Sequence, residues 1–127
     1  FQHAPDITQH AARLQRAGVV VVFSMTGLAP HFAHKVRQSA GNAVAHGMPW
    51  DAALAGLTAN PAAVFGLGAS RGRIETGMVA DLVLWNGDPL EVTSAADQVW
   101  VGGKPMSMRS RQTELLDRYL PQAARQP

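Results

Sequence analysis

One loop of this chain carries side chains that could do chemistry, directly after an apolar segment. Residues 19–23 are consecutive apolar, mostly β-branched residues, which predicts a strand covered on both faces, as in a parallel sheet. The following residues, 24–31, include Ser24, Thr26 and His31. In α/β folds, ligands bind at the carboxyl ends of the parallel strands. We therefore expect this loop to contact a ligand.

The histidines give little sign of a metal site. His31 and His34 are three residues apart, so on one helix they would share a face and could share a metal ion, but no third ligand is close in the sequence. His3, His10 and His46 are expected to face solvent. For His31 two interpretations remain open: contact with a substrate, or a surface position at the start of a helix.

Other catalytic patterns have simpler structural explanations. Asp81 and Asp88 could form a carboxylate pair, but Asp88 precedes a proline in a predicted turn and Asp81 lies in a predicted strand. The glycines at 66, 68, 72 and 77 do not follow the Gly-x-Gly-x-x-Gly pattern of a phosphate-binding loop. The serines lack a Gly-x-Ser-x-Gly motif. With no cysteine in the chain, thiolate nucleophiles and Cys-based zinc sites are excluded. The tryptophans at 50, 85 and 100 are expected in the core.

Composition and charge argue against nucleic acid and membranes as partners. The 127-residue chain is 46% hydrophobic and 16% charged, which is typical of a globular protein with one core. Its arginines are scattered and its formal net charge is only +2, whereas nucleic-acid binding needs a concentrated basic face. The longest apolar run, 18–23, is too short to span a bilayer, so we expect a soluble chain. Its start at Phe1 predicts a fragment or processed product, and we expect a cytoplasmic rather than secreted location.

Apolar spacing and breaker residues predict a series of helices in the first half of the chain. Residues 5–17 have helical periodicity and end at Gly18. A second helix, 31–46, ends at Gly47, and a third runs from Trp50 towards Asn60 with Trp50 on its buried side. Asn60 is a good N-cap for a short helix over 61–65. The order of helix, apolar strand and helix indicates an α/β fold.

The second half of the chain is predicted to contain strands separated by glycine turns. Gly72, Gly77 and Gly87 are expected to adopt positive φ, and residues 79–85 alternate as a strand does. Residues 98–101 form a second strand, Gly102-Gly103 a two-residue hairpin, and 104–108 the returning strand. A last helix over 110–120 has an apolar side for docking, made by Leu115, Leu116 and Tyr119.

Five segments together resemble the C-terminal part of the metal-dependent amidohydrolase superfamily, in its imidazolonepropionase-like branch. They are AAL at 52–54, LTANPA at 57–62, GRIETGMVADLVLW at 72–85, GDPL at 87–90 and VWVGGK at 99–104. The resemblance covers about residues 18–104, in the family's order and at close spacing. It implies a (β/α)8 barrel, which holds one or two divalent metals, with a small β-sandwich attached.

Only the end of such an enzyme would be present in this chain. The resemblance makes 19–23 the eighth barrel strand, 31–65 the covering helices and 72–108 sandwich strands. The domains are then 1–68 for the barrel end, 69–109 for the sandwich segment and 110–127 for the C-terminal helix and tail. The implied activity is metal-dependent hydrolysis of C–N bonds in cyclic or other non-peptide amides, and the isolated fragment is expected to be inactive.

The implied partners are the rest of the same polypeptide and a small-molecule substrate, and assembly into a homo-oligomer is left open. The expected cofactor is a divalent metal, with zinc the first choice, bound mostly by residues upstream of this chain. In such a site the ion would lower the pKa of a bound water, and a base would accept the proton. The family's His-x-His motif is absent from this chain, as expected if it lies upstream.

The family's Asp after the eighth strand is also missing. One alignment places Thr26 at that position and another places Gly27 there, and neither residue accepts a proton at neutral pH. A threonine hydroxyl could instead order a water, so Thr26 is the candidate catalytic residue, with Gly27 and His31 as candidate substrate-binding residues. The alternative is a noncatalytic ligand-binding or assembly module that lost the Asp. A small independent interaction domain is disfavoured, because a lone barrel strand leaves its edges uncovered.

Overall fold

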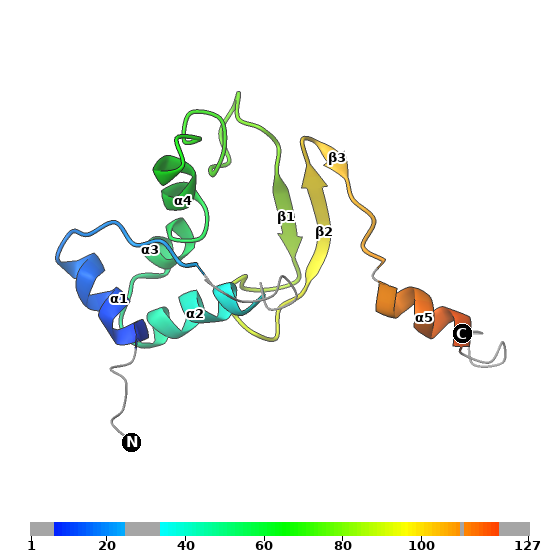
Figure 1. Ribbon diagram of the computed structural model, residues 1–127, viewed down its shortest axis with the longest axis horizontal. Coiled ribbons are helices and arrows are strands. Elements are labelled where there is room, and N and C mark those ends of the chain that lie inside the picture. The colour runs from blue at the N-terminus through cyan, green and yellow to red at the C-terminus, as the bar shows by residue number, and fades with distance from the viewer. Residues whose placement is uncertain (1–6, 25–33, 110, 120–127) are drawn as a thin grey trace, which may run out of the picture.

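The computed structural model describes residues 7–24, 34–109 and 111–119. In Figure 1, four helices, α1 to α4, form one group, a three-stranded antiparallel sheet stands beside them, and α5 lies beyond the sheet. The described part of the chain is therefore a small α/β fragment of five helices and three strands. None of its helices has both the length and the apolar character needed to cross a membrane.

The first two helices confirm the prediction from apolar spacing. α1 spans Ile7–Arg16 and α2 spans His34–Ala45. The chain leaves each helix through a glycine with positive φ, 86° at Gly18 and 100° at Gly47, because glycine adopts the left-handed conformation at little cost. Both predicted helix ends are thus correct to within about two residues, the usual uncertainty of such boundaries.

The core lies between α1, α2 and α3, which spans Trp50–Ala55. Its buried apolar residues are small, apart from one methionine and one leucine: Ala11, Ala12, Ala40, Ala43, Met48, Ala53 and Leu90. Small side chains let the helix backbones approach closely, but they bury little apolar area. Trp50, which we expected to be buried, is 39% exposed at the start of α3.

The fourth helix begins earlier than predicted and is capped differently. α4 spans Ala59–Val64, and its N-cap residue is Thr58, which makes no side-chain capping bond. The Thr58 hydroxyl instead donates to the Leu54 carbonyl at 2.8 Å. Asn60, the predicted N-cap, lies inside α4, and its amide donates to the Val21 carbonyl at 2.9 Å. A contact across 39 residues has thus replaced the local capping bond.

Residues 19–23 do not form the predicted strand. Val19 is 47% exposed and Val20 is 67% exposed, so the expectation of a segment buried on both faces is wrong for this chain. A strand is defined by hydrogen bonds to a neighbouring strand, and in the described residues no strand lies beside this segment. The apolar composition is present, but the sheet that would cover it is not.

The hairpin is correct, whereas the first strand is shorter than predicted. β1 (Leu82–Trp85) pairs antiparallel with β2 (Ala96–Val101), which pairs antiparallel with β3 (Lys104–Pro105). Gly102 and Gly103 have φ of 58° and 82°, as a two-residue hairpin of the primed type requires. The return strand ends at Pro105, so the prediction of a strand over 104–108 is too long.

Asp81 explains why β1 begins only at Leu82. Its carboxylate accepts a hydrogen bond from the Gly102 N–H at 2.8 Å and pairs with Arg71. Next to it, the Gly103 N–H donates to the Ala80 carbonyl at 2.9 Å. Residues 80 and 81 are therefore bonded to the hairpin turn and not to a strand. Buried and exposed side chains were predicted to alternate along this strand. They do not, since the neighbours Val83 and Leu84 are 44% and 54% exposed.

Gly87 is required for close packing and does not adopt the predicted positive φ. Positive φ is found at Gly72 and Gly77, as expected, but not at Gly87. A Cβ atom at Gly87 would lie 2.8 Å from the Ser94 hydroxyl oxygen, and Ser94 is buried. The glycine is therefore explained by a close approach across the loop between β1 and β2.

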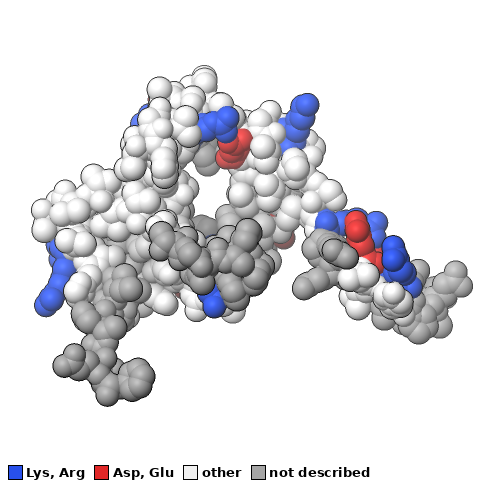
Figure 2. All heavy atoms as spheres, in the orientation of Figure 1, with Lys and Arg blue, Asp and Glu red and all other residues white. Residues whose placement is uncertain are grey.

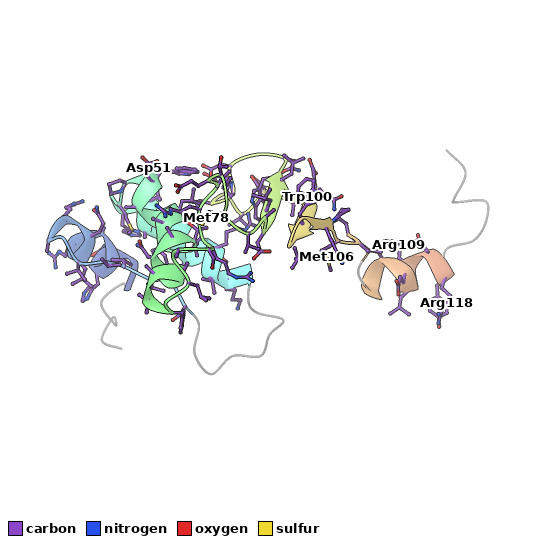
Figure 3. The ribbon with its side chains drawn as sticks, turned by 90° about the horizontal axis from the view of Figure 1, so that it is seen from above. Asp51, Met78, Trp100, Met106, Arg109 and Arg118 are labelled. Carbon is purple, nitrogen blue, oxygen red and sulfur yellow. The ribbon has the colours of Figure 1, made fainter. Side chains whose placement is uncertain are left out.

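The last helix forms, but its apolar side is not docked on the rest of the described chain. α5 spans Arg111–Tyr119, and Arg109 pairs with Asp117 at 2.6 Å. Leu115 is 40%, Leu116 58% and Tyr119 76% exposed. Figure 3 shows the helix, with Arg109 and Arg118 labelled, away from the other helices. The predicted docking face thus exists without a partner among the described residues.

We predict that Asp81 stabilises the hairpin mainly through its bond to the turn. Asp81→Ala should lower the free energy of unfolding by about 1–2 kcal/mol, because the Gly102 N–H loses its acceptor. Asp81→Asn keeps an oxygen for that bond and loses the exposed ion pair with Arg71, which should cost less than about 1 kcal/mol. Urea unfolding of the two variants beside the wild-type protein measures both values. Equal losses for Ala and Asn would contradict this assignment.

Candidate functional site

The three candidate site residues cannot be placed by the structure. Thr26, Gly27 and His31 lie in residues 25–33, outside the described residues. Their roles therefore stay predictions. We call residues 25–33 the candidate loop. The structure describes the residues on either side of it, up to Ser24 and from His34 onward.

The first end of the candidate loop is anchored to α3 and α4. The Phe23 N–H donates to the Gly56 carbonyl at 3.0 Å, and the Asn60 amide donates to the Val21 carbonyl at 2.9 Å. A Cβ atom at Gly56 would lie 2.8 Å from the Phe23 ring, so glycine is needed there for the ring to approach. These contacts fix residues 21–23 although no sheet holds them.

The second end of the candidate loop leads directly into α2. In that helix, one Arg37 nitrogen donates to the Pro89 carbonyl at 2.9 Å and to the Glu91 carbonyl at 2.8 Å. The Arg37 guanidinium also lies over the Trp85 ring, 4.6 Å from its centre, a favourable cation–π distance. A helix next to the candidate loop is thereby tied to the loop between β1 and β2.

The histidines in the described residues do not make a metal site. His10 is exposed on α1, and the exposed His46 ring donates to the Asn42 carbonyl at 2.8 Å. His3 lies outside the described residues, and the side chain of His34 is not described, so the His31–His34 pair stays untested. Throughout the part of the chain that the structure describes, no three His, Asp or Glu residues are grouped closely enough to hold a metal ion.

The two carboxylates considered as a catalytic pair are both used structurally. Asp81 holds the hairpin turn, as described above. Asp88 accepts the Leu90 N–H at 2.9 Å and the Trp50 indole N–H at 3.0 Å. The interpretation of Asp88 as a turn residue is confirmed, and the bond to Trp50 adds a tie between this turn and α3.

An open apolar groove runs beside residues 19–21. Its volume is about 290 Å³. Two polar side chains, Gln15 and Asn60, stand among glycine and apolar residues along its walls, which are lined by Gln15, Gly18, Val19, Val20, Val21, Met48, Ala52, Ala55 and Asn60. Among its lining residues there is no acid, base or nucleophile, so the groove offers no group for acid–base or nucleophilic catalysis.

On the face shown in Figure 2, charged side chains do not gather in one patch. Basic side chains stand singly on the helices and the hairpin, and on α5 they mix with acidic ones (Figure 2). The described ion pairs Arg71–Asp81, Arg73–Glu75 and Arg109–Asp117 are all exposed at both partners, so they contribute little to stability.

Sequence reasoning missed three residues that shape this region. They are Arg37, one of the arginines scattered along the chain, Asn60, which the sequence predicts as a helix cap, and Gly41 in α2. A Cβ atom at Gly41 would lie 2.3 Å from the Leu90 carbonyl oxygen. A glycine inside a helical pattern is a signal for such close packing; for Arg37 and Asn60 the sequence holds no comparable signal, because their acceptors are backbone carbonyls far along the chain.

Comparison with known proteins gives consistent matches. The model of the Amidohydrolase family matches residues 10–106. The chain is 47% identical over 58 residues to amidohydrolase tasK of Hapsidospora irregularis, a match that covers 46% of this chain and 6% of that protein. The crystal structure of an amidohydrolase from Thermotoga maritima MSB8 matches with a TM-score of 0.69 and 32% identity, over 80% of this chain and 26% of that one. The chain thus spans a small part of these relatives.

We predict that Asn60 holds the first end of the candidate loop. Asn60→Ala should lower the free energy of unfolding by about 1–2 kcal/mol, since the partly buried Val21 carbonyl loses its donor. Asn60→Asp should cost more, because a carboxylate oxygen would then face that carbonyl. Hydrogen exchange of the amides at 21–23, which should quicken in both variants, gives the local readout. Unchanged exchange there would show that Asn60 does not anchor this segment.

Proposed function

Because the chain belongs to the amidohydrolase family, we propose that it forms the C-terminal part of a larger, metal-dependent hydrolase that cleaves C–N bonds in cyclic amides or related small substrates. The observation that carries the proposal is the family match over residues 10–106, which includes α2 to α4 and the hairpin. The motifs LTANPA at 57–62 and GRIETGMVADLVLW at 72–85 favour an imidazolonepropionase-like parent.

The uncovered surface supports the proposal that most of the protein lies outside this chain. Large apolar side chains are open to solvent, among them Val20 (67%), Phe65 (77%) and Ile74 (91%). We infer that the remainder of the same polypeptide covers them.

In this proposal residues 19–23 are the eighth strand of a (β/α)8 barrel. The exposed valines and the apolar groove beside them support it, because a neighbouring strand and helix would cover both. The anchored end at Phe23 would then place the candidate loop at the carboxyl end of that strand, where barrel enzymes bind their substrates.

No group of the described residues fits a metal site. In our proposal the ligands of the ion, with zinc as the expected metal, come mainly from residues upstream of this chain. What this chain would contribute is the candidate loop. In our proposal the Thr26 hydroxyl orders a water or the substrate, and Gly27 and His31 contact the substrate. The isolated chain would then be inactive.

A second candidate function is a noncatalytic ligand-binding or assembly module with the same fold. The observation that favours it is the threonine or glycine at the position where the family has an Asp after the eighth strand. Such a protein would keep the surfaces that bind the rest of the polypeptide and would lack the group that accepts a proton.

We predict that the parent protein contains a His-x-His motif upstream of this chain, binds zinc and hydrolyses a small cyclic amide. Removal of the metal by a chelator should abolish turnover, and added zinc should restore it. The measurements are metal content by mass spectrometry and hydrolysis of a panel of cyclic amides. A parent sequence without His-x-His would exclude this function, and a parent inactive on every amide with no bound metal would favour the noncatalytic module.

We further predict a role for the Thr26 hydroxyl. Thr26→Val removes the hydroxyl at nearly constant volume and should lower kcat/KM of the parent by about 10²-fold, the lower range for a group that assists proton transfer. Thr26→Ser keeps the hydroxyl and should stay within about threefold of wild type, a difference below 1 kcal/mol. The two variants are compared by steady-state kinetics at saturating metal. Equal activity of Val and wild type would remove Thr26 from the site.

A further inference from the structure

The peptide unit between Asn86 and Gly87 brings together two groups that can react with each other. The backbone nitrogen of the residue after an asparagine can attack the side-chain amide, which closes a five-membered succinimide ring and releases ammonia. The attack is easiest when that residue is glycine, because no side chain crowds its nitrogen. Asn42 precedes an alanine and Asn60 precedes a proline, whose nitrogen carries no hydrogen. Asn86 alone among the asparagines of the chain precedes a glycine.

The pairing of β1 with β2 is changed at Asn86 in a way that favours this reaction. The Asn86 N–H donates to the Ala95 carbonyl at 3.0 Å, as it does when two residues of an antiparallel pair exchange both backbone bonds. The return bond runs instead from the Ala95 N–H to the side-chain oxygen of Asn86, at 2.9 Å. The side-chain carbonyl thus replaces the backbone carbonyl, and the peptide unit between Asn86 and Gly87 is released from the ladder.

The attacking nitrogen is accessible. Asn86 and Gly87 are both exposed, and among the described residues no acceptor binds the Gly87 N–H. A Cβ atom at Gly87 would lie 2.8 Å from the hydroxyl oxygen of the buried Ser94. The packing of this loop therefore requires the residue that leaves the nitrogen least crowded.

The bond from Ala95 also favours the reaction at the carbon that is attacked. When a nitrogen adds to an amide carbon, negative charge develops on the amide oxygen. The Ala95 N–H already donates to that oxygen of Asn86, so a hydrogen-bond donor stands where the charge forms, as in an oxyanion hole. The fold thus frees the nucleophile and polarises the electrophile at the same position.

We propose that Asn86 is a site of spontaneous deamidation in the folded protein. The Gly87 nitrogen loses its proton to base in the solvent and bonds to the Asn86 Cγ, and the side-chain nitrogen leaves as ammonia after taking up a proton. Water then opens the succinimide at one of its two carbonyls, which gives aspartate or isoaspartate. No oxidant or reductant is needed. This inference is independent of the proposed hydrolase function.

The two products affect the loop between β1 and β2 differently. Aspartate keeps the length of the backbone and an oxygen that can accept the Ala95 N–H. Isoaspartate carries the chain through the former side-chain carbon and so adds one methylene to the backbone. This longer backbone leads into the segment that places Leu90 in the core. We therefore expect isoaspartate, and not aspartate, to speed hydrogen exchange over residues 86–95.

Peptide mapping of the parent protein by mass spectrometry tests the proposal. Incubation in mildly alkaline buffer should convert the Asn86 amide to an acid, and an isoaspartyl methyltransferase should label the same peptide. The rate should rise with pH, because the attacking nitrogen must lose its proton. Asn42 and Asn60 are controls within the same molecule and should stay intact.

A double substitution separates the chemistry at Gly87 from the packing around it. Gly87→Ala combined with Ser94→Ala removes the hydroxyl that would clash, and the added methyl group then lies 3.8 Å from the Cβ of residue 94. Deamidation should slow about tenfold, which corresponds to about 1.4 kcal/mol in the barrier. Ser94→Ala alone is the matched control and should keep the rate of the wild-type protein.

A synthetic peptide of residues 82–92 gives the rate without the fold, since it lacks the Ala95 donor. The folded protein should deamidate at no less than about one tenth of the rate of the peptide, a barrier difference of about 1.4 kcal/mol. A slower rate in the protein, or equal modification of Asn86 and Asn42, would overturn the inference. Equal rates in Ser94→Ala and in the double variant would also overturn it, because the Gly87 nitrogen would then not be the attacking group.

Discussion

The contact of α2 with residues 88–91 is the constraint on which the arrangement of helices and hairpin depends. Gly41 lets the Leu90 backbone approach the helix, and Arg37 then bonds to the carbonyls on either side of it. Two segments almost 50 residues apart are joined with very little buried apolar area, since the core consists largely of alanines. Hydrogen bonds and close steric fit therefore hold α2 and this segment together, a role that apolar packing has in larger cores.

Features set by local chemistry could be predicted from the sequence. Gly18 and Gly47 end their helices, and Gly102-Gly103 makes the hairpin, because a left-handed conformation next to a periodic segment is determined within a few residues. Three of the predictions that failed concern Trp50, Asn60 and residues 19–23. Each of them depends on a partner far along the chain, or on one outside it, so periodicity could not reveal the outcome.

The candidate site could be predicted only in part for a related reason. The motif around Asp81 identifies the family, yet that carboxylate binds the Gly102 N–H and Arg71, so the most recognisable residue of the chain holds a turn. Thr26, Gly27 and His31 lie outside the described residues, and their roles stay predictions. What the structure adds is the anchoring of the residues before that loop, through the bond from Asn60 to the Val21 carbonyl and the bond from the Phe23 N–H to Gly56.

The segment at 19–23, which forms no strand in this chain, bears on our proposal that a larger polypeptide covers it. Its composition is that of a strand buried on both faces, and its anchors at Val21 and Phe23 are formed without any sheet. The segment is therefore anchored by contacts within this chain, while Val19 and Val20 are open to solvent and an apolar groove lies beside them. Exposed apolar surface of this kind is unfavourable in water at about 25 cal/mol per Å². A chain that keeps such a surface gains stability when a complementary strand and helix cover it, which is the physical reason for our proposal that the rest of a barrel packs against this segment.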